Sequence, residues 1–523
     1  MCGIIGIIHK NKSIQTESFE AGFFAIKNRG REEYIYDLSP SERYGYHRLP
    51  TDGLDKAVSK KLSRGKLPLC LFNGIITNID QLISEFKLNP QCRSSDTQTL
   101  AEGFQKHGIP FLNRCRGMFA FAHITKDAIT LSRDSIGIKP LYYIFENDTF
   151  VFASEMKALL PFSDGGIQSV QPGEIISFDK RSFSISKDRI TYRPTTKKYS
   201  LEELLVRSLI EPTRRYLQQT TKPIGLLLSG GLDSSLLLGL FAKHLDRSEF
   251  QRVQCFSIGK PDADDSRATT LLGYTFGISL QHVILPSDKE CLDMVQQIVH
   301  AVESPYARVV KVAFLQDALA KEIKRAGIDV IVSGEGADEL FYGYRKFIDG
   351  LTFPQIDEVY KTFLTEMFPQ TLLQRLDRIF ARHCIEGRVP FLDQDLVAYA
   401  MKLPAHKKML RTESTLVVKV PLRKLARTLG VPQEIADREK MPMLHGSTTQ
   451  TNTENESGFL EEYCQKKLGM SCSKLVEKIY MDLYGHTKTV DRLTGSATFD
   501  MRTKELSLAL SLRERKSVHK TAV

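Results

Sequence analysis

Short apolar runs separated by turn residues fill the first third of the chain. Apolar or alternating stretches at residues 4–8, 67–72, 118–124, 129–132, 141–145, 150–153 and 174–178 predict strands. Turn pairs such as Asn73-Gly74 and Pro172-Gly173 punctuate them. Helical periodicity at residues 18–27 and 96–106 interrupts the strands. The pattern predicts a first domain over residues 2–190 in which β-strands pack with helices.

The pattern changes after residues 187–198, a polar stretch with Pro194 that we interpret as a linker. Residues 201–217 have helical periodicity. Short apolar strands at 223–228, 253–258 and 328–332 then alternate with helices, the first of which covers about residues 234–245. Strands that alternate with helices predict a parallel α/β sheet. We assign this second domain to residues 199–447.

The end of the chain is polar. Residues 448–457 contain Thr, Gln, Asn, Glu and Ser only, and the last residues are basic. Two helices are expected, near residues 460–468 and 474–484. No chemistry is identified here, and we interpret residues 448–523 as a peripheral or partly disordered extension of unknown role.

Composition excludes several classes of protein. The 523 residues are 42% hydrophobic and 26% charged, and the net charge of +10 is spread along the chain without a basic run interleaved with aromatics. Nucleic-acid binding is not expected from a charge that is spread in this way. Membrane insertion is not expected either, because no apolar run approaches about 18 residues. The nine cysteines form no CxxC pair. They fit reduced thiols in a cytoplasmic protein that acts on small molecules.

Cys2 is the first candidate for chemistry. If Met1 is removed, Cys2 becomes the N-terminal residue. A terminal cysteine combines a strong nucleophile with an α-amine that can act as its base. The sequence therefore predicts a nucleophilic thiol at one end of the first domain.

A glycine-rich loop follows the strand at residues 223–228. Gly230 and Gly231 let the backbone approach a phosphate closely, and Ser229 and Ser234 add hydroxyl donors. The amide groups of such a loop and the start of the next helix form an anion site. Asp233 would repel a phosphate alone, so we expect it to hold Mg²⁺ against the phosphate.

A second loop, residues 333–339, leaves the strand at 328–332. It carries three carboxylates, Glu335, Asp338 and Glu339, and should face the same crevice, because both strands end at one edge of the sheet. Clustered carboxylates beside a phosphate are costly unless a cation neutralises them. One carboxylate on Mg²⁺ and another directed to the substrate is the arrangement that we expect.

These segments, in this order, resemble the glutamine-dependent asparagine synthetases over about residues 2–447. In the first domain the resemblance rests on Met1-Cys2-Gly3-Ile4, His47-Arg48-Leu49, Asn73-Gly74, Arg116-Gly117-Met118-Phe119-Ala120, Arg133-Asp134, and the segments 137–143 and 152–157. In the second it rests on residues 228–235, 256–259, 333–339 and 388–393. Arg438-Glu439-Lys440 with Gly446-Ser447 is more similar to the diverged eukaryotic branch, the asparagine synthetase domain-containing proteins.

The resemblance implies an α/β enzyme with two sites. An N-terminal Ntn-hydrolase αββα sandwich, a class II glutamine amidotransferase, would release ammonia from glutamine. A C-terminal parallel-sheet domain of the ATP pyrophosphatase type would use ATP and Mg²⁺ to form β-aspartyl-AMP, which ammonia converts to asparagine. An internal tunnel would connect the sites. The implied activity is that of an asparagine synthase (glutamine-hydrolysing).

Roles carry over residue by residue from the resemblance. In the first domain, Cys2 would attack the glutamine amide, Asn73 and the Gly74 amide would form the oxyanion hole, Arg48 would bind the substrate carboxylate, and Asp96 would bind its ammonium. In the second, Asp233 and Asp338 match metal-binding acids. Leu228, Ser229, Gly230, Gly231, Asp233, Ser234, Ile258, Ser333 and Gly334 would bind ATP. Glu335 and Lys440 would orient the reaction and stabilise its charged transition state.

Three segments depart from the family pattern. Ile75 replaces a glutamate that helps to bind the glutamine ammonium, Arg29-Gly30-Arg31-Glu32 replaces Arg-Gly-Pro-Asp, and residues 380–383 are unusual. Two alternatives therefore stay open: an ammonia-dependent synthetase with an impaired glutaminase, or a weakly active paralogue with a regulatory or binding role. The true acceptor and the oligomeric state are also left open.

Overall fold

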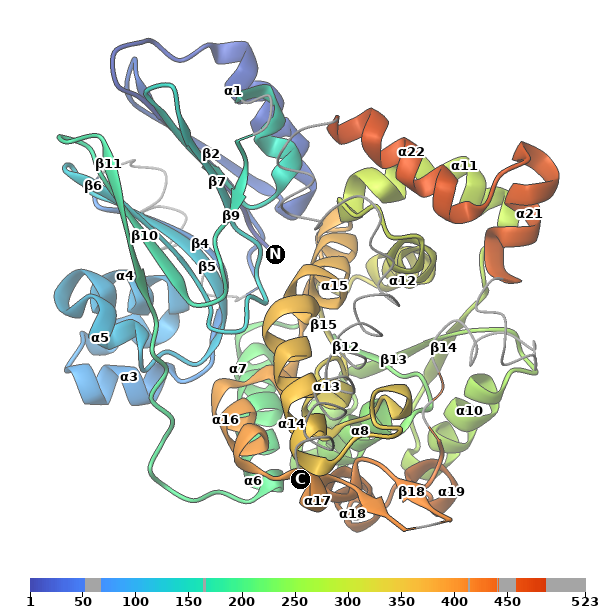
Figure 1. Cartoon of the computed structure of the whole chain (residues 1–523). Coiled ribbons are helices and arrows are strands. Elements are labelled where there is room, and N and C mark those ends of the chain that lie inside the picture. Colours follow the sequence, from blue (N-terminus) through green and yellow to red (C-terminus); the bar gives the residue numbers. More distant parts are fainter. Residues whose placement is uncertain (52–66, 163–165, 413, 440, 442–457, 486–523) are drawn as a thin grey trace, which may run out of the picture.

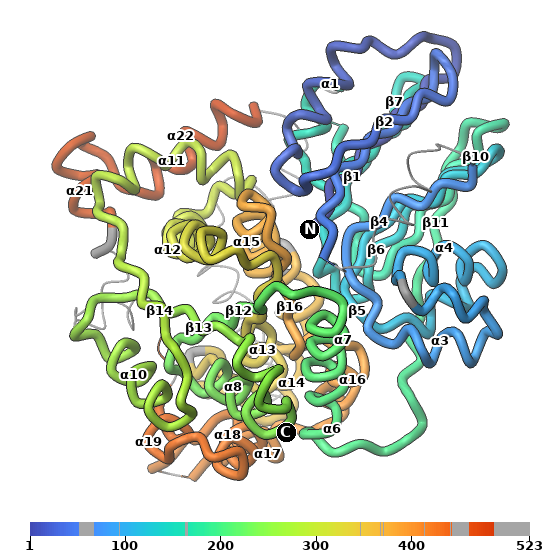
Figure 2. Tube along the Cα trace, turned by 180° about the vertical axis from the view of Figure 1, so that it is seen from behind, coloured from blue at the N-terminus to red at the C-terminus, as the bar shows by residue number. Residues whose placement is uncertain are grey.

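The structure is a computed structural model. It describes residues 1–51, 67–162, 166–412, 414–439, 441 and 458–485. Figure 1 shows a β-rich N-terminal part beside a larger C-terminal part built around a parallel sheet, and Figure 2 shows the same arrangement from behind. The predicted α/β fold class is confirmed. Among the described helices, none combines the length and the apolar content needed to cross a lipid bilayer.

Two antiparallel sheets form the N-terminal part. The first has the order β2-β3-β1-β8-β7-β9 and the second β11-β10-β6-β5-β4. Their strands are β1 (Gly3–His9), β2 (Glu32–Ser39), β3 (Glu42–Arg48), β4 (Leu69–Ile76), β5 (Gly117–Ile124), β6 (Ala128–Arg133), β7 (Tyr142–Glu146), β8 (Thr149–Ala153), β9 (Gln168–Ser169), β10 (Glu174–Asp179) and β11 (Ser184–Arg189).

Helices cover the outer faces of these two sheets. They are α1 (Thr16–Ala25) on the first sheet and α3 (Ile79–Phe86), α4 (Asp96–His107) and α5 (Ile109–Leu112) on the second. Strand β1 is apolar on both faces because it is buried on both: Ile4 and Ile8 point into the core between the sheets, whereas Ile5 and Ile7 pack towards α1. The αββα layering implied by the resemblance is therefore present.

A five-stranded parallel sheet organises the C-terminal part, in the order β14-β13-β12-β15-β16. Its strands are β12 (Ile224–Leu227), β13 (Val253–Ile258), β14 (Leu280–Val283), β15 (Val330–Val332) and β16 (Glu386–Arg388). Along the chain, β13 and β14 are added on one side of β12, and β15 and β16 are then added on its other side. In such a sheet a crevice opens between β12 and β15, where the strand order reverses.

Helices surround this sheet (Figure 1). They are α6 (Leu201–Leu205), α7 (Glu211–Gln219), α8 (Leu232–His244), α9 (Arg247–Phe250), α10 (Asp264–Phe276), α11 (Asp288–Val302), α12 (Ala307–Arg325), α13 (Ala337–Phe341), α14 (Phe353–Thr362), α15 (Leu372–Arg382), α16 (Gln394–Lys402), α17 (Ala405–Lys408), α18 (Val420–Thr428) and α19 (Gln433–Ala436). A small hairpin, β17 (Leu410–Arg411) and β18 (Leu416–Val417), precedes α18.

The predicted linker, residues 187–198, begins three residues too early. Residues 187–189 belong to β11, whose residues are exposed except for one half-buried position. An edge strand with so little burial carries no hydrophobic signal, which is why it reads as linker. The two helices expected in the C-terminal extension are confirmed as α21 (Gly458–Leu468) and α22 (Cys472–Tyr484), and both pack on α11.

Buried polar contacts join the two parts. Arg116 donates to Asp393 at 2.8 Å, and Gln394 exchanges two hydrogen bonds with the backbone of Gly117 at 2.6 and 2.8 Å. Arg29 donates to Asp377 at 2.8 Å, with both side chains almost fully buried. Breaking a buried ion pair of this kind costs about 3–5 kcal/mol, so the contacts fix one orientation of the two parts.

Candidate functional site

The thiol of Cys2 lies at the start of β1, in a narrow cavity of about 60 Å³ that we call the thiol pocket. The backbone N–H of Cys2 donates to Asn73 Oδ1 at 3.0 Å. The N–H of Leu49 points at the sulfur, 3.4 Å away. Arg29 Nε donates to the Cys2 carbonyl oxygen at 2.8 Å. Cys2, the residue immediately before β1, is thus fixed from three sides, which orients the thiol.

Asn73 and Gly74 present hydrogen-bond donors next to this sulfur. Both lie in β4, and Asn73 is fully buried. Its Nδ2 has no hydrogen-bond partner among the described residues, a costly state for a buried donor unless a ligand completes it. Gly74 has φ +148°, and a Cβ there would lie 2.0 Å from the Met118 carbonyl oxygen. The geometry therefore leaves a donor available for a developing oxyanion.

The predicted substrate-binding residues also line the thiol pocket. Arg48, Ile75 and Asp96 all contribute to its wall. Arg48 is 5% exposed and pairs with Glu32 at 3.0 Å. Asp96 begins α4, and its Oδ2 accepts from the Ile76 N–H at 3.3 Å. The wall of the pocket thus contains one arginine, one aspartate and the apolar side chain of Ile75.

Six lining residues of the thiol pocket come from the C-terminal part, and sequence reasoning did not place them there. Glu386 and Arg388, in β16, face the cavity and pair with each other at 2.8 Å. Met1 is also buried, in the apolar cluster that includes Met118 and Ile138. Because these contacts join segments that are distant in sequence, no local sequence pattern predicts them.

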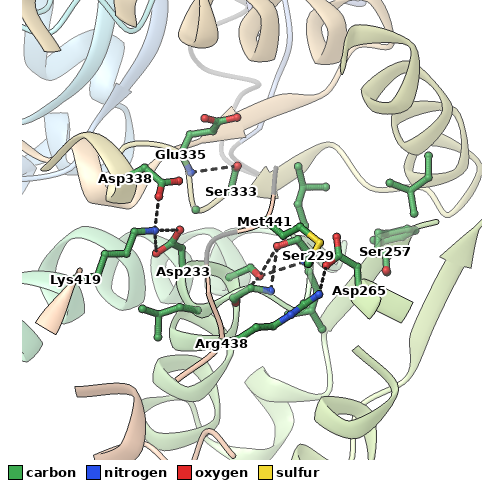
Figure 3. Close-up of a pocket in the computed structure, with 18 of the residues that line it drawn as sticks. Ser229, Asp233, Ser257, Asp265, Ser333, Glu335, Asp338, Lys419, Arg438 and Met441 are labelled. Carbon is green, nitrogen blue, oxygen red and sulfur yellow. Dashed lines mark hydrogen bonds and ion pairs between the residues drawn. The ribbon is translucent and has the colours of Figure 1, made fainter. Parts of the chain in front are cut away.

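A second cavity, of about 180 Å³, lies at the carboxyl edge of the parallel sheet between β12 and β15 (Figure 3). We call it the sheet-edge pocket. Of the residues predicted to bind ATP, all but one line it: Leu228, Ser229, Gly231, Asp233, Ser234, Ile258, Ser333 and Gly334. Gly230 is the exception. It has φ +70°, and a Cβ would lie 2.7 Å from Ala268, so it shapes the loop against α10.

The glycine loop is held by its own serines. Ser234 Oγ accepts from the Ser229 N–H at 3.1 Å, and the two hydroxyls lie 3.1 Å apart. Gly231 N-caps α8, so the first amides of that helix face the loop. This strand–loop–helix arrangement is a ready anion site.

Asp233 and Asp338 come together, as expected, but a lysine joins them. Lys419 Nζ lies 2.6 and 2.8 Å from the two carboxylate oxygens of Asp233 and 2.5 Å from Asp338 Oδ1 (Figure 3). Lys419 is 3% exposed and immediately precedes α18. The two acids therefore converge on one cation. Sequence reasoning missed Lys419, although a lysine inside the apolar run 416–421 is a signal of paired burial.

The acidic loop 333–339 has its own charge arrangement. Glu335 lines the sheet-edge pocket and pairs with Arg375 at 3.1 Å. Glu339 is buried, accepts from the Tyr344 hydroxyl at 2.5 Å, and has its pKa raised to about 8 by burial and by the neighbouring Asp338 and Glu335. Glu339 is thus a hydrogen-bonding acid at neutral pH, while Glu335 faces the cavity.

Arg438 closes another side of the sheet-edge pocket. It pairs with Asp265 at 2.9 Å and donates to the Gly230 carbonyl at 3.2 Å. Glu439 and Met441 also line the cavity. Lys440, the predicted transition-state residue between them, lies outside the described residues.

The two acids suit a divalent cation with oxygen ligands. Mg²⁺ is commonly held by one or two carboxylates together with the phosphates of a substrate. Asp233 and Asp338 already direct oxygens at one positive group, and the glycine loop beside them can supply the phosphate position. The residues present therefore fit Mg²⁺, with the Lys419 ammonium as its neighbour.

Comparison with known proteins identifies both parts. Residues 1–194 match the glutamine amidotransferase domain family, and residues 205–355 and 350–512 match the asparagine synthase family. The chain is 28% identical over 440 residues to asparagine synthetase B [glutamine-hydrolyzing] of Escherichia coli, covering 78% of this chain and 76% of that protein. It is also 28% identical over 387 residues to asparagine synthetase [glutamine-hydrolyzing] 3 of Arabidopsis thaliana, covering 70% and 65%.

Among solved structures, the glutamine phosphoribosylpyrophosphate amidotransferase of B. subtilis matches with a TM-score of 0.30 and 15% identity, covering 64% of this chain and 81% of that one. The family matches extend over both parts of the chain and over more than half of its length. The protein belongs to the asparagine synthase family and carries an N-terminal glutamine amidotransferase domain.

Proposed function

We propose that the protein makes asparagine from aspartate, with ATP as the energy source and glutamine as the nitrogen donor. The observation that carries this proposal is the pair of separate pockets. One places a thiol beside the buried Asn73 amide, whose Nδ2 has no hydrogen-bond partner among the described residues. The other places two converging acids beside a glycine-rich anion loop. Residues 2–190 would perform the first reaction and residues 199–447 the second.

In the thiol pocket, Cys2 would attack the glutamine amide carbonyl. After loss of Met1, the amine of Cys2 would take the thiol proton, and it would stay next to Asn73 Oδ1. Asn73 Nδ2 and the Gly74 N–H would stabilise the oxyanion, Arg48 would bind the substrate carboxylate, and Asp96 its ammonium. Collapse of the tetrahedral adduct would break the C–N bond, release ammonia and leave a thioester on Cys2, which water would then hydrolyse to glutamate and the free thiol.

In the sheet-edge pocket, the loop from Ser229 to Ser234 would bind the ATP phosphates, and Asp233 with Asp338 would hold Mg²⁺, which supplies charge neutralisation. Ile258 would contact the nucleotide. Glu335 and Lys440 would orient the acceptor and the incoming ammonia. Lys419 adds a positive charge at the same point, where a pyrophosphate leaving group gains negative charge. The β-aspartyl-AMP formed there would react with ammonia to give asparagine and AMP.

The thiol pocket supports a second candidate, a synthetase that uses free ammonia and hydrolyses glutamine poorly. Ile75 offers no charge to the substrate ammonium, and Glu32 already pairs with the Arg48 guanidinium. Glutamine would have to share that arginine with Glu32, whereas ammonia bypasses the pocket.

Pyrophosphate release distinguishes these candidates. The protein, ATP and Mg²⁺ are incubated with each amino acid in turn, and either glutamine or ammonium is supplied. The proposal expects release that depends on aspartate and occurs with both nitrogen sources. Release with ammonium alone selects the second candidate. No release with any amino acid, from protein that binds ATP, rules out a synthetase.

A further inference from the structure

A third cavity, of about 430 Å³, lies where three segments of the chain meet. Its walls come from the N-terminal part around α1, from α11 and α15, and from Leu483 of α22. Figures 1 and 2 both show α22 lying along α11 at the top of the C-terminal part. This junction cavity shares no lining residue with the thiol pocket or the sheet-edge pocket.

The lining of the junction cavity is rich in positive charge. Four arginine or lysine side chains face it, against a single carboxylate, and the polar residues between them are amides and one histidine. The charged residues are Arg29, Lys157, Arg378, Arg382 and Glu155. A concave site lined by one sign of charge concentrates ligands of the opposite sign.

Each of the four cations contacts a carboxylate, yet two of the guanidinium groups keep a donor without a hydrogen-bond partner among the described residues. Arg378 pairs with Glu303 at 2.5 Å, yet its Nε is buried and has no hydrogen-bond partner among the described residues. Arg382 Nη1 lies 3.4 Å from Asp317 and forms an ion pair with it. This nitrogen is also buried, and it has no hydrogen-bond partner in the described part of the chain. Unsatisfied guanidinium donors in a cavity wall are expected where an anion completes them.

The size of the junction cavity indicates the kind of anion. Pockets for small organic ligands measure about 300–1,000 Å³, and 430 Å³ lies in that range. Inorganic phosphate alone would leave most of the space empty. We propose that the junction cavity binds a small organic polyanion, a phosphate ester or a polycarboxylate, through Arg378, Arg382 and Lys157.

The contacts of Arg29 connect this cavity to the thiol pocket. Arg29 lines the cavity, pairs with Glu155 and Asp377, and donates through Nε to the Cys2 carbonyl oxygen at 2.8 Å. Lys157 and Arg29 share Glu155, so an anion held by Lys157 shifts the Arg29–Glu155 pair and with it the position of Cys2. Occupancy therefore alters the rate of glutamine hydrolysis. This consequence rests on the proposed function, whereas binding itself does not.

Calorimetric titration of the full chain tests the binding. Citrate, ribose 5-phosphate and inorganic phosphate are the probes, and a non-hydrolysable ATP analogue keeps the sheet-edge pocket filled. Arg382→Gln removes one guanidinium from the wall, and Gln297→Glu places a carboxylate there at an exposed, isosteric position. Arg325→Gln is the control, because Arg325 is an exposed arginine that does not line the cavity.

At least one organic probe is expected to bind, more tightly than inorganic phosphate. Each cavity variant should weaken it about tenfold, which corresponds to ~1.4 kcal/mol, and Arg325→Gln should leave it unchanged. The arm that binds identifies a phosphate ester or a polycarboxylate as the ligand class. No binding by the wild type, equal wild-type affinity for inorganic phosphate and the organic probes, or undiminished wild-type affinity in both cavity variants overturns the proposal.

The effect on rate is measured separately, as glutamine hydrolysis with and without the bound probe. The probe should change the wild-type rate, and Arg382→Gln should need about tenfold more probe for the same change. An unchanged wild-type rate refutes the coupling through Arg29. If the wild type binds the probe but never hydrolyses glutamine, the proposed function fails while the anion site stands.

Discussion

Replacement of Lys419 by methionine should destabilise the C-terminal part strongly. The lysine side chain is 4% exposed, and the two acids it contacts are 14% and 10% exposed. Lys419→Met preserves most of the aliphatic side chain but removes the charge. It leaves Asp233 and Asp338 facing each other in a site largely closed to water. The two carboxylates then repel, and one of them must take up a proton.

The size of the effect follows from this burial. Removing one partner of a buried ion pair costs about 3–5 kcal/mol. For a part of the chain of roughly 250 residues, each kcal/mol lowers the unfolding midpoint by about 2–4 °C, so a decrease on the order of 10 °C is expected. Lys106→Met is the matched control, because Lys106 is half exposed and pairs with Glu102 within one exposed helix turn. A surface pair of this kind contributes at most about 1 kcal/mol.

Differential scanning calorimetry measures the effect, and the transition that an ATP analogue raises identifies the C-terminal part. Mg²⁺ should raise the midpoint of Lys419→Met more than that of the wild type, since the two carboxylates have lost the neighbouring ammonium and gain more from a divalent cation. The reasoning is refuted if Lys419→Met unfolds within 2 °C of the Lys106→Met control. It is also refuted if Mg²⁺ stabilises both proteins equally.

Three further variants test the two pockets. Cys2→Ala should abolish asparagine formation from glutamine and preserve formation from ammonium; loss of both in a folded, ATP-binding protein would contradict a dedicated nucleophile. Asp233→Asn should lower pyrophosphate release by at least tenfold with either nitrogen source, and normal turnover would exclude the metal assignment. Ile75→Glu should raise kcat/KM for glutamine roughly 10- to 100-fold, because a charge-assisted hydrogen bond is worth about 1.5–3 kcal/mol. Efficient wild-type hydrolysis with no gain in Ile75→Glu would show that another group, such as Glu32, binds the ammonium.

Local pattern was enough to predict the elements whose own residues form a continuous apolar run or a recognisable loop. The apolar strands β1, β5 and β13, and the loops that leave β12 and β15, have signals in their own residues. The last three residues of β11, 187–189, resemble linker in sequence because the side chains of this strand are mostly exposed. Strand β16 was missed because three residues, Glu386 to Arg388, carry no periodicity at all.

The candidate site was predictable to the extent that its residues lie in motifs. The loops with Asp233 and Asp338 were expected at one sheet edge, and the structure brings them together. Lys419 enters the same site from a segment about 80 residues further along the chain, so only tertiary packing reveals it. The same holds for Glu386 and Arg388 in the thiol pocket, and for the junction cavity, which no single segment forms.

The central claim, nitrogen transfer from one pocket to the other, is tested most directly by isotope tracing. The protein is incubated with aspartate, ATP, Mg²⁺, glutamine labelled with ¹⁵N in its amide, and excess unlabelled ammonium, and the asparagine formed is analysed by mass spectrometry. We predict that wild-type asparagine carries ¹⁵N in its amide above the level set by mixing with the ammonium pool, and that Cys2→Ala gives unlabelled asparagine. Asparagine whose label only matches the mixed pool, or hydrolysis of glutamine without any asparagine, would contradict the account.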